Sequence, residues 1–213
     1  MSAPVNGFSV DGRFVPLTVT DRHVAEPPAF GVALAHVFSS AWAGPEAVEV
    51  ARAAVEAVGI ENGPSYVQLR IGPAGPQVIE LAARLGGGHD AELCRAALGV
   101  DLNGLAVAAA LGERAEVQYG ERAGGACTRF LVAPAGVLEE VGGVEEARAV
   151  EGVQDVRIYR EPGHVFGPFR RGADRAGAVL ATGESRDQAL ERSAEAARLI
   201  RFKVGAESLA QKA

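Results

Sequence analysis

The alternation of apolar and polar residues predicts strands near the start of the chain and a helix soon afterwards. Residues 8–20 hold two β-type segments on either side of Asp11-Gly12, a dipeptide typical of tight hairpin turns. From Pro45 to Val58, apolar residues recur at spacings of three and four, which predicts a helix that Gly59 ends. Residues 21–44, between these elements, show no sustained period and are expected to be irregular.

A second hairpin is predicted at residues 65–71 and 76–83, joined by Pro73-Ala74-Gly75. A three-residue loop with a left-handed glycine would pair Gln68 with Glu80 across the two strands. Directly opposed residues share one face of a sheet, so this register separates a polar face from a core face. The polar face would carry Tyr66, Gln68, Val78 and Glu80, and the core face Val67, Leu69, Ile79 and Leu81.

Two helices are predicted next, Asp90–Leu98 with Asp90 as its cap, and Leu102–Leu111. From Ala126 the pattern changes to a β-β-α-β-β-α order that ends in a helix over residues 185–202, capped by Ser185. The chain is therefore expected to be α+β. The predicted parts are a first domain (1–112), a polar linker (113–125), a small domain (126–204) and a disordered tail (205–213).

Composition narrows the class of protein. The 213 residues carry a net charge of -6, which argues against non-specific binding to nucleic acid. No apolar run approaches the roughly 20 residues that span a membrane, and the N-terminus lacks the features of a signal peptide. Cys94 and Cys127 are far apart and favour reduced thiols over a disulfide or metal site. We therefore expect a cytoplasmic protein.

The strand that ends the second hairpin carries unusual charges. Glu80 lies inside an apolar run, Arg84 follows four residues later, and Gly86, Gly87 and Gly88 come next. A carboxylate is a typical Mg²⁺ ligand, the Gln68 amide oxygen would be a weaker neutral one, and a guanidinium suits phosphate. Glycines let the backbone approach a ligand closely. Each of these residues also has a non-functional alternative. Glu80 and Arg84 could form a surface ion pair, Gln68 could be a solvated strand residue, and the glycines could be a flexible connector.

The run GIENGPSYVQLRIGPAGPQVIELAARLGGG (59–88) resembles the C-terminal half of an ATP-grasp ligase, in the branch that includes L-amino-acid ligases. Residues 8–23 and 30–42 are similar to the segments that usually precede this motif. Residues 126–202 resemble the small domain that follows it. The resemblance implies the second lobe of an ATP-grasp fold, an antiparallel sheet with helices, followed by a small α+β sandwich domain.

The resemblance also implies roles for individual residues. Glu80 and Gln68 would hold Mg²⁺, or Mn²⁺, and with Leu81 would bind ATP. Gln68 replaces a usual Glu, and Ala82 stands where many members have Asn. Arg84 would be the catalytic contact to the transferred phosphate. The substrate would be bound by Arg84, His36, Gly86, Gly87 and Gly88. For His36 the alternative is a histidine that only packs against its neighbours. His89 and His164 receive no role.

The function implied is that of an ATP-dependent carboxylate–amine ligase, which forms an amide or peptide bond through an acyl phosphate. An amino acid is the expected substrate class. Lys203 and Lys212 are the only lysines, so the lysines with which the family's other lobe grips phosphate are absent. We therefore expect a component that is inactive alone, completed by a partner chain or by homo-oligomers. Two alternatives remain: a non-catalytic module for nucleotide or amino acid, and a degenerate remnant.

Overall fold

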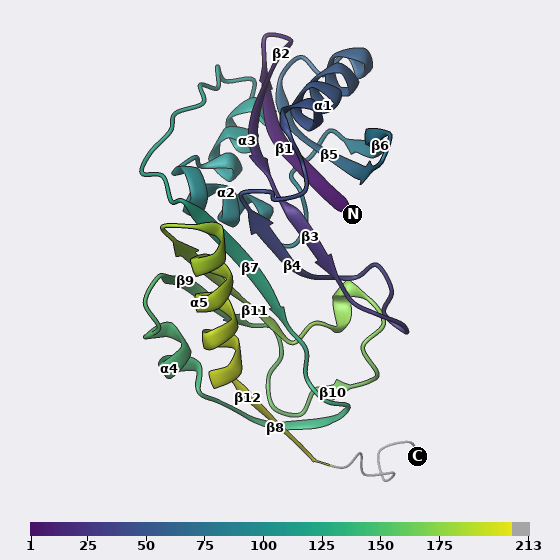
Figure 1. Cartoon of the computed structure of the whole chain (residues 1–213). Helices are drawn as coiled ribbons and strands as arrows, with labels where there is room; N and C mark the ends of the chain where they lie inside the picture. Colours follow the sequence, from purple (N-terminus) through teal and green to yellow (C-terminus); the bar gives the residue numbers. More distant parts are fainter. Residues whose placement is uncertain (206–213) are drawn as a thin grey trace.

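The computed structural model describes residues 1–205, which form three antiparallel sheets and five helices (Figure 1). The α+β class with antiparallel sheets is confirmed. Of the predicted tail, residues 206–213 lie outside the described residues, and Gly205 ends a strand.

The first sheet has the order β2-β1-β5-β6 and contains both predicted hairpins. Its strands are β1 (Ser2–Val10), β2 (Arg13–Val19), β5 (Gly63–Gly72) and β6 (Gly75–Ala82). Helix α1 (Pro45–Val58) ends at a left-handed Gly59, as predicted, and covers one face of the sheet (Figure 1). Its Ala47, Ala51 and Val55 pack against buried Val67 and Leu69 of β5.

The β5–β6 hairpin differs from its prediction in the turn but has the predicted pairing of Gln68 with Glu80. Gly72 pairs with Gly75, so the loop has two residues and the predicted three-residue turn is wrong. A bulge between Gln68 and Leu69 then shifts the register by one residue and restores the predicted pair of Gln68 with Glu80. The extra residue, Ile79, is exposed, so its predicted core position is wrong.

The second sheet has the order β3-β4-β7-β11-β9 and joins both ends of the chain. Its strands are β3 (Asp21–Val24), β4 (Ala33–Phe38), β7 (Gly125–Leu131), β11 (Gly177–Gly183) and β9 (Val153–Ile158). The expectation that residues 21–44 are irregular is therefore wrong at β3 and β4. Because β4 pairs with β7, this sheet runs across the predicted linker at 113–125. The division into two domains stays a prediction.

The third sheet, β10-β8-β12, closes the other end of the molecule. It contains β10 (Val165–Phe166), β8 (Gly136–Gly142) and β12 (Arg201–Gly205). Helix α5 (Arg186–Leu199) is capped by Ser185, as predicted, but ends before Arg201. The chain turns extended at Ile200 and pairs with β8, so the predicted helix is too long. Two short elements remain, α4 (Val144–Arg148) and the 3₁₀ turn η1 (Gly172–Asp174).

Helices α2 (Asp90–Leu98) and α3 (Leu102–Ala110) fill the space between the first two sheets. Their Leu93, Leu98 and Leu102 share one core with Phe8 of β1 and Leu180 of β11. The cap of α2 is His89 in a left-handed conformation, so Asp90 is not the cap. Asp90 is instead the first residue of the helix, and its side chain is fully buried.

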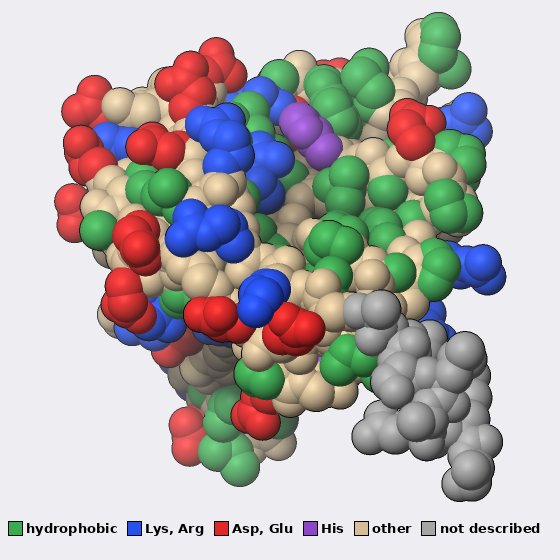
Figure 2. Space-filling view, turned by 90° about the horizontal axis from the view of Figure 1, so that it is seen from below, with side chains coloured by type: hydrophobic (Ala, Val, Ile, Leu, Met, Phe, Trp, Pro, Cys, Tyr) green, Lys and Arg blue, Asp and Glu red, His purple; other side chains and the backbone are tan. Residues whose placement is uncertain are grey.

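Charge is unevenly distributed on the surface. In the face shown in Figure 2, hydrophobic side chains gather on the right and acidic ones lie mostly on the left. Within residues 1–205, no single helix is long and apolar enough to cross a membrane. The pair α2 and α3 meets both criteria jointly but is bent by 118°.

A buried ion pair connects the two ends of the chain. Asp21 of β3 is fully buried and lies 2.7 Å from the guanidinium of Arg186, the first residue of α5. The same carboxylate accepts hydrogen bonds from the Ser40 hydroxyl at 2.5 Å and the Ala41 backbone N–H at 2.9 Å. Since a buried charge is costly without partners, this cluster ties α5 to the β3–β4 region.

Arg186→Ala should lower the free energy of unfolding by about 3 kcal/mol, because it leaves the Asp21 carboxylate buried without its cation. Urea unfolding followed by circular dichroism measures this. The matched control is Arg198→Ala, an exposed position on the same helix, expected to change stability by less than about 0.5 kcal/mol. Equal unfolding midpoints for both variants would show that the pair contributes nothing.

Cys94 and Cys127 are free and buried, in agreement with the prediction of reduced thiols. Burial raises the pKa of the Cys94 thiol from its ordinary 9.0 to about 12, and burial also raises the pKa of Cys127. The thiolate is the form that attacks thiol reagents, so both thiols should react slowly in native protein at about pH 8 and quickly in denaturant. A colorimetric thiol assay tests this.

The free energy of unfolding should also fall as the pH rises from about 9 towards 12. The two thiols ionise at a lower pH in the unfolded chain than in the native protein, so rising pH favours the unfolded state.

Candidate functional site

A pocket of about 520 Å³ lies where the first two sheets meet the glycine loop (residues 86–88) and η1. It is lined by Arg22 of β3, by residues 30–33, by His36 of β4, by Tyr66, Gln68 and Glu80 of the β5–β6 hairpin, and by Arg84, Gly87, Gly88, Gly172 and Arg175. Most of the residues singled out in the sequence therefore lie around one cavity. Of the others, Gly86 packs against Asp90, Asn6 and Tyr66, and Leu81 points to the opposite face of β6, against the α1 core.

The hairpin places a carboxylate and an amide oxygen side by side. Gln68 and Glu80 are direct partners in the ladder, and Glu80 is exposed while Gln68 is half-buried. The Tyr66 hydroxyl donates to Gln68 Oε1 at 3.1 Å. Burial, and then the nearby Asp90 charge, raises the pKa of Tyr66 to about 12, so this hydroxyl keeps its proton at neutral pH. The hydrogen bond fixes the orientation of the Gln68 amide oxygen.

Gln68 and Glu80 alone offer few oxygen donors for a metal ion. No group of three or more His, Cys, Asp or Glu side chains in residues 1–205 is arranged to hold an ion. One carboxylate and one neutral oxygen suit Mg²⁺ when phosphate oxygens and water supply the remaining ligands. The donors that are present therefore fit a metal that arrives with a nucleotide.

Arg84 lies at the exposed end of β6. Its guanidinium donates to the Leu85 carbonyl at 2.8 Å and lies 5.5 Å from the centroid of the Tyr66 ring. It forms no ion pair with Glu80 among the pairs of the described residues, so the alternative of a simple surface bridge is not observed. The guanidinium keeps donors free for a ligand.

His36 is held by a buried carboxylate. Its Nδ1 lies 2.6 Å from Asp90 Oδ1, with the histidine 5% exposed and the aspartate fully buried. The His36 ring also meets Phe130 edge-on, at 5.6 Å between centroids. His36 is thus both packed, as the alternative reading proposed, and part of the pocket lining. Asp90 is the partner that sequence reasoning missed, because it was assigned to a helix cap.

Two of the three glycines are required by this packing. A side chain at Gly86 would collide with Asp90, Asn6 and Tyr66. Gly88 has φ +71, and a Cβ there would lie 2.9 Å from Phe130 Cζ and 3.0 Å from His36 Cε1. Gly87 has open space around it. The loop therefore passes directly over His36, with its middle residue facing the pocket.

Comparison with known proteins shows which folds the chain is similar to. Residues 129–205 match the family described as L-amino acid ligase C-terminal domain 2. An L-amino acid ligase from Bacillus licheniformis superposes with a TM-score of 0.80 at 20% identity, covering 96% of this chain and 54% of that one. A phosphoribosylglycinamide synthetase from Anaerococcus prevotii reaches 0.84 at 14% identity, over 96% and 53%. The chain has the fold of the C-terminal half of an ATP-grasp ligase.

A further relative is closer in sequence. The uncharacterized protein y4rH of Sinorhizobium fredii is 36% identical over 146 residues, which are 67% of this chain and 30% of that protein. The chain thus spans under a third of that relative and about half of the solved ATP-grasp structures.

Sequence reasoning missed two residues that line the pocket, Arg22 and Arg175. Arg22 lies in a segment expected to be irregular, and Arg175 begins a segment, residues 175–183, that was expected to be a strand of the small domain. No local pattern marks either one, because only the pairing of β4 with β7 brings their segments together. His89 and His164 lie outside the pocket lining. The ring nitrogens of His89 are hydrogen-bonded to the Tyr159 hydroxyl and the Arg157 guanidinium.

Gly88→Ala should lower the free energy of unfolding by about 1–2 kcal/mol, because an L residue at φ +71 is strained and its methyl group meets Phe130 and His36. Gly87→Ala, one residue earlier and in open space, is the matched control and should be neutral. Thermal unfolding of both variants tests the loop path. A neutral Gly88→Ala would contradict it.

Proposed function

We propose that the chain forms the metal- and acyl-phosphate-binding half of an ATP-dependent carboxylate–amine ligase. The observation that carries the proposal is the pocket itself. Glu80, Gln68, Arg84, His36 and the glycine loop come from separate segments and line one cavity. The pocket thus brings together two oxygen donors suited to Mg²⁺, a guanidinium suited to phosphate and a glycine backbone.

Glu80 and Gln68 would hold Mg²⁺, or Mn²⁺, between the phosphates of ATP. Their register brings the two oxygens onto the same side of the hairpin, and Tyr66 leaves one lone pair of Gln68 Oε1 free. A similar fold, the biotin carboxylase domain of a Hydrogenobacter thermophilus 2-oxoglutarate carboxylase, was solved with MgADP. It has a TM-score of 0.69 at 16% identity and covers 95% of this chain and 46% of that one. The nucleotide contact assigned to Leu81 would come from its backbone, since its side chain faces the α1 core.

When bound, ATP supplies a phosphoryl group that converts the substrate carboxylate to an acyl phosphate. The amine nitrogen then attacks the carbonyl carbon, an amide C–N bond forms, and phosphate leaves. Arg84 would stabilise the charge on the transferred phosphoryl group, and the Gly86–Gly88 backbone would approach the carboxylate end of the substrate. His36, fixed by Asp90, would position the substrate from the β4 side. An amino acid is the proposed substrate class, and the cytoplasm, where ATP is available, the proposed location.

Activity is proposed for a complete two-lobed site. The solved structures with this fold are about twice as long as this chain. The second lobe would come from the same polypeptide or from a partner chain, and a homo-oligomer is the other arrangement that we propose to test.

A second candidate is a module that binds nucleotide or amino acid without turnover. The observation in its favour is Gln68, which leaves Glu80 as the only carboxylate of the pocket lining. A weaker metal site would retain binding while lowering the rate of phosphoryl transfer.

Titration calorimetry of the purified chain with ADP, with and without Mg²⁺, should show saturable Mg²⁺-dependent binding. Glu80→Ala should abolish the Mg²⁺-dependent part, because it removes the only carboxylate that reaches the phosphates. The control is Glu61→Ala, an exposed carboxylate on the segment before β5. Unchanged binding in Glu80→Ala would contradict the metal assignment, and no heat from folded wild type would contradict a pre-formed half-site.

Gln68→Glu should tighten Mg²⁺ by on the order of tenfold, since it adds a negative charge beside Glu80. Mn²⁺ titrations monitored by electron paramagnetic resonance measure the same change independently. No difference from wild type would mean that Gln68 does not face the metal.

A further inference from the structure

The pocket contains three arginines without carboxylate partners. Arg22, Arg84 and Arg175 take part in none of the ion pairs formed by residues 1–205. Glu80 is the single acidic residue of the lining. The cavity is therefore locally cationic in a chain whose net charge is -6. The proposed function uses Arg84 for the transferred phosphoryl group and leaves Arg22 and Arg175 without a role.

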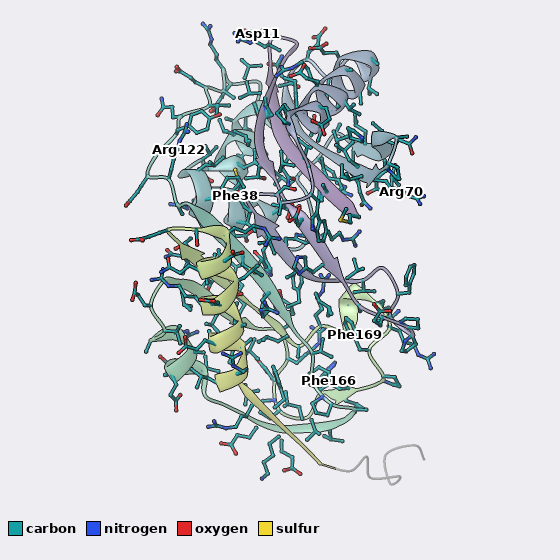
Figure 3. All side chains as sticks on the ribbon, viewed as in Figure 1. Asp11, Phe38, Arg70, Arg122, Phe166 and Phe169 are labelled. Carbon is teal, nitrogen blue, oxygen red and sulfur yellow. The ribbon has the colours of Figure 1, made fainter. Side chains whose placement is uncertain are left out.

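Arg175 is held rigidly against the wall of the pocket. Its guanidinium donates to the Ala33 carbonyl at 2.7 Å and its Cζ lies 3.6 Å from the centroid of the Phe130 ring. Its buried Nε has no hydrogen-bond partner among the described residues. The loop that carries Phe169 and η1 lies beside the β3–β4 connection (Figures 1 and 3). Arg175 directly follows η1 and so reaches Ala33 at the start of β4. A fixed, partly buried cation with spare donors is expected to bind an anion.

Arg22 reaches the same cavity from β3. It is the direct partner of His36 in the β3–β4 ladder, so both side chains project from one face of the sheet. Burial lowers the pKa of Arg175, and the positive charge of Arg22 lowers it further, which indicates that the two guanidinium groups sense each other. Two neighbouring cations repel, and an anion bound between them removes that cost.

We propose that Arg22 and Arg175 bind a second anionic group of the substrate, so that the ligase acts on an amino acid with an acidic side chain, a carboxylate or a phosphate. The inference rests on the proposed function for the amino-acid class. A neutral side chain would leave both guanidinium groups uncompensated, whereas planar forks match carboxylate and phosphate oxygens. Discrimination between acidic and neutral ligands follows, since a polar site rejects an analogue that cannot pair with it.

The test is calorimetry of the full chain with two pairs of ligands, L-glutamate against L-glutamine and O-phospho-L-serine against L-serine. In wild type, the acidic member of at least one pair should bind about tenfold more tightly than its neutral partner. Arg175→Ala should remove that preference, and so should Arg22→Ala, which serves as a second variant if the loss of the Phe130 contact unfolds the first. Arg70→Ala, an exposed arginine of β5 (Figure 3), is the matched control and should keep the preference.

If the affinities differ between L-glutamate and L-glutamine, the bound group is a carboxylate. If they differ between O-phospho-L-serine and L-serine, it is a phosphate. Equal binding within both pairs, or a preference that survives in folded Arg175→Ala and Arg22→Ala, overturns the inference. So does the loss of MgADP binding in these variants, since the arginines would then belong to the nucleotide site. Nucleotide titration reports on the proposed function and amino-acid titration on this inference, so the two can fail separately.

Discussion

The pocket depends on the buried contact between His36 and Asp90. It joins β4 to the first turn of α2 at 2.6 Å, and the glycine loop runs between these two elements against both side chains. Phe130 of β7 contacts the same histidine edge-on, and the Arg175 guanidinium lies over its ring. One polar contact in an apolar setting therefore positions the loop and both walls of the cavity. Its removal would leave a buried carboxylate unpaired, which costs more than the net gain from a typical hydrogen bond.

Elements with strong local signals were predictable from the sequence. Asp11-Gly12, Gly59 and Ser185 mark a turn, a helix end and a helix start, and each does so in the structure. Strands β3 and β12 were not predictable, because their residues alternate weakly and become strands only by pairing with β4 and β8. Local propensity determines the turn and the helix ends, whereas pairing with distant strands determines β3 and β12.

The same distinction applies to the site. Gln68 and Glu80 could be placed together because a hairpin is a local structure, although the predicted turn was wrong and a bulge restored their pairing. His36, Arg22 and Arg175 meet through a sheet that joins both ends of the chain, and no spacing in the sequence encodes that meeting. His36 was found through family resemblance, and the two arginines were found only in the structure. Asp90 was read as a cap because its position before a helix suits that role equally well.

The bulge at Ile79 has a consequence for how this hairpin can change during evolution. A two-residue loop with a bulge and a three-residue loop without one give the same partners for Gln68 and Glu80. A deletion in the turn is therefore neutral for the site when an extra residue is accommodated in the strand, and the reverse holds as well. The loop length can drift between relatives while the oxygen pair stays in place. Alignments that count residues only from the turn would misplace the partner of Gln68.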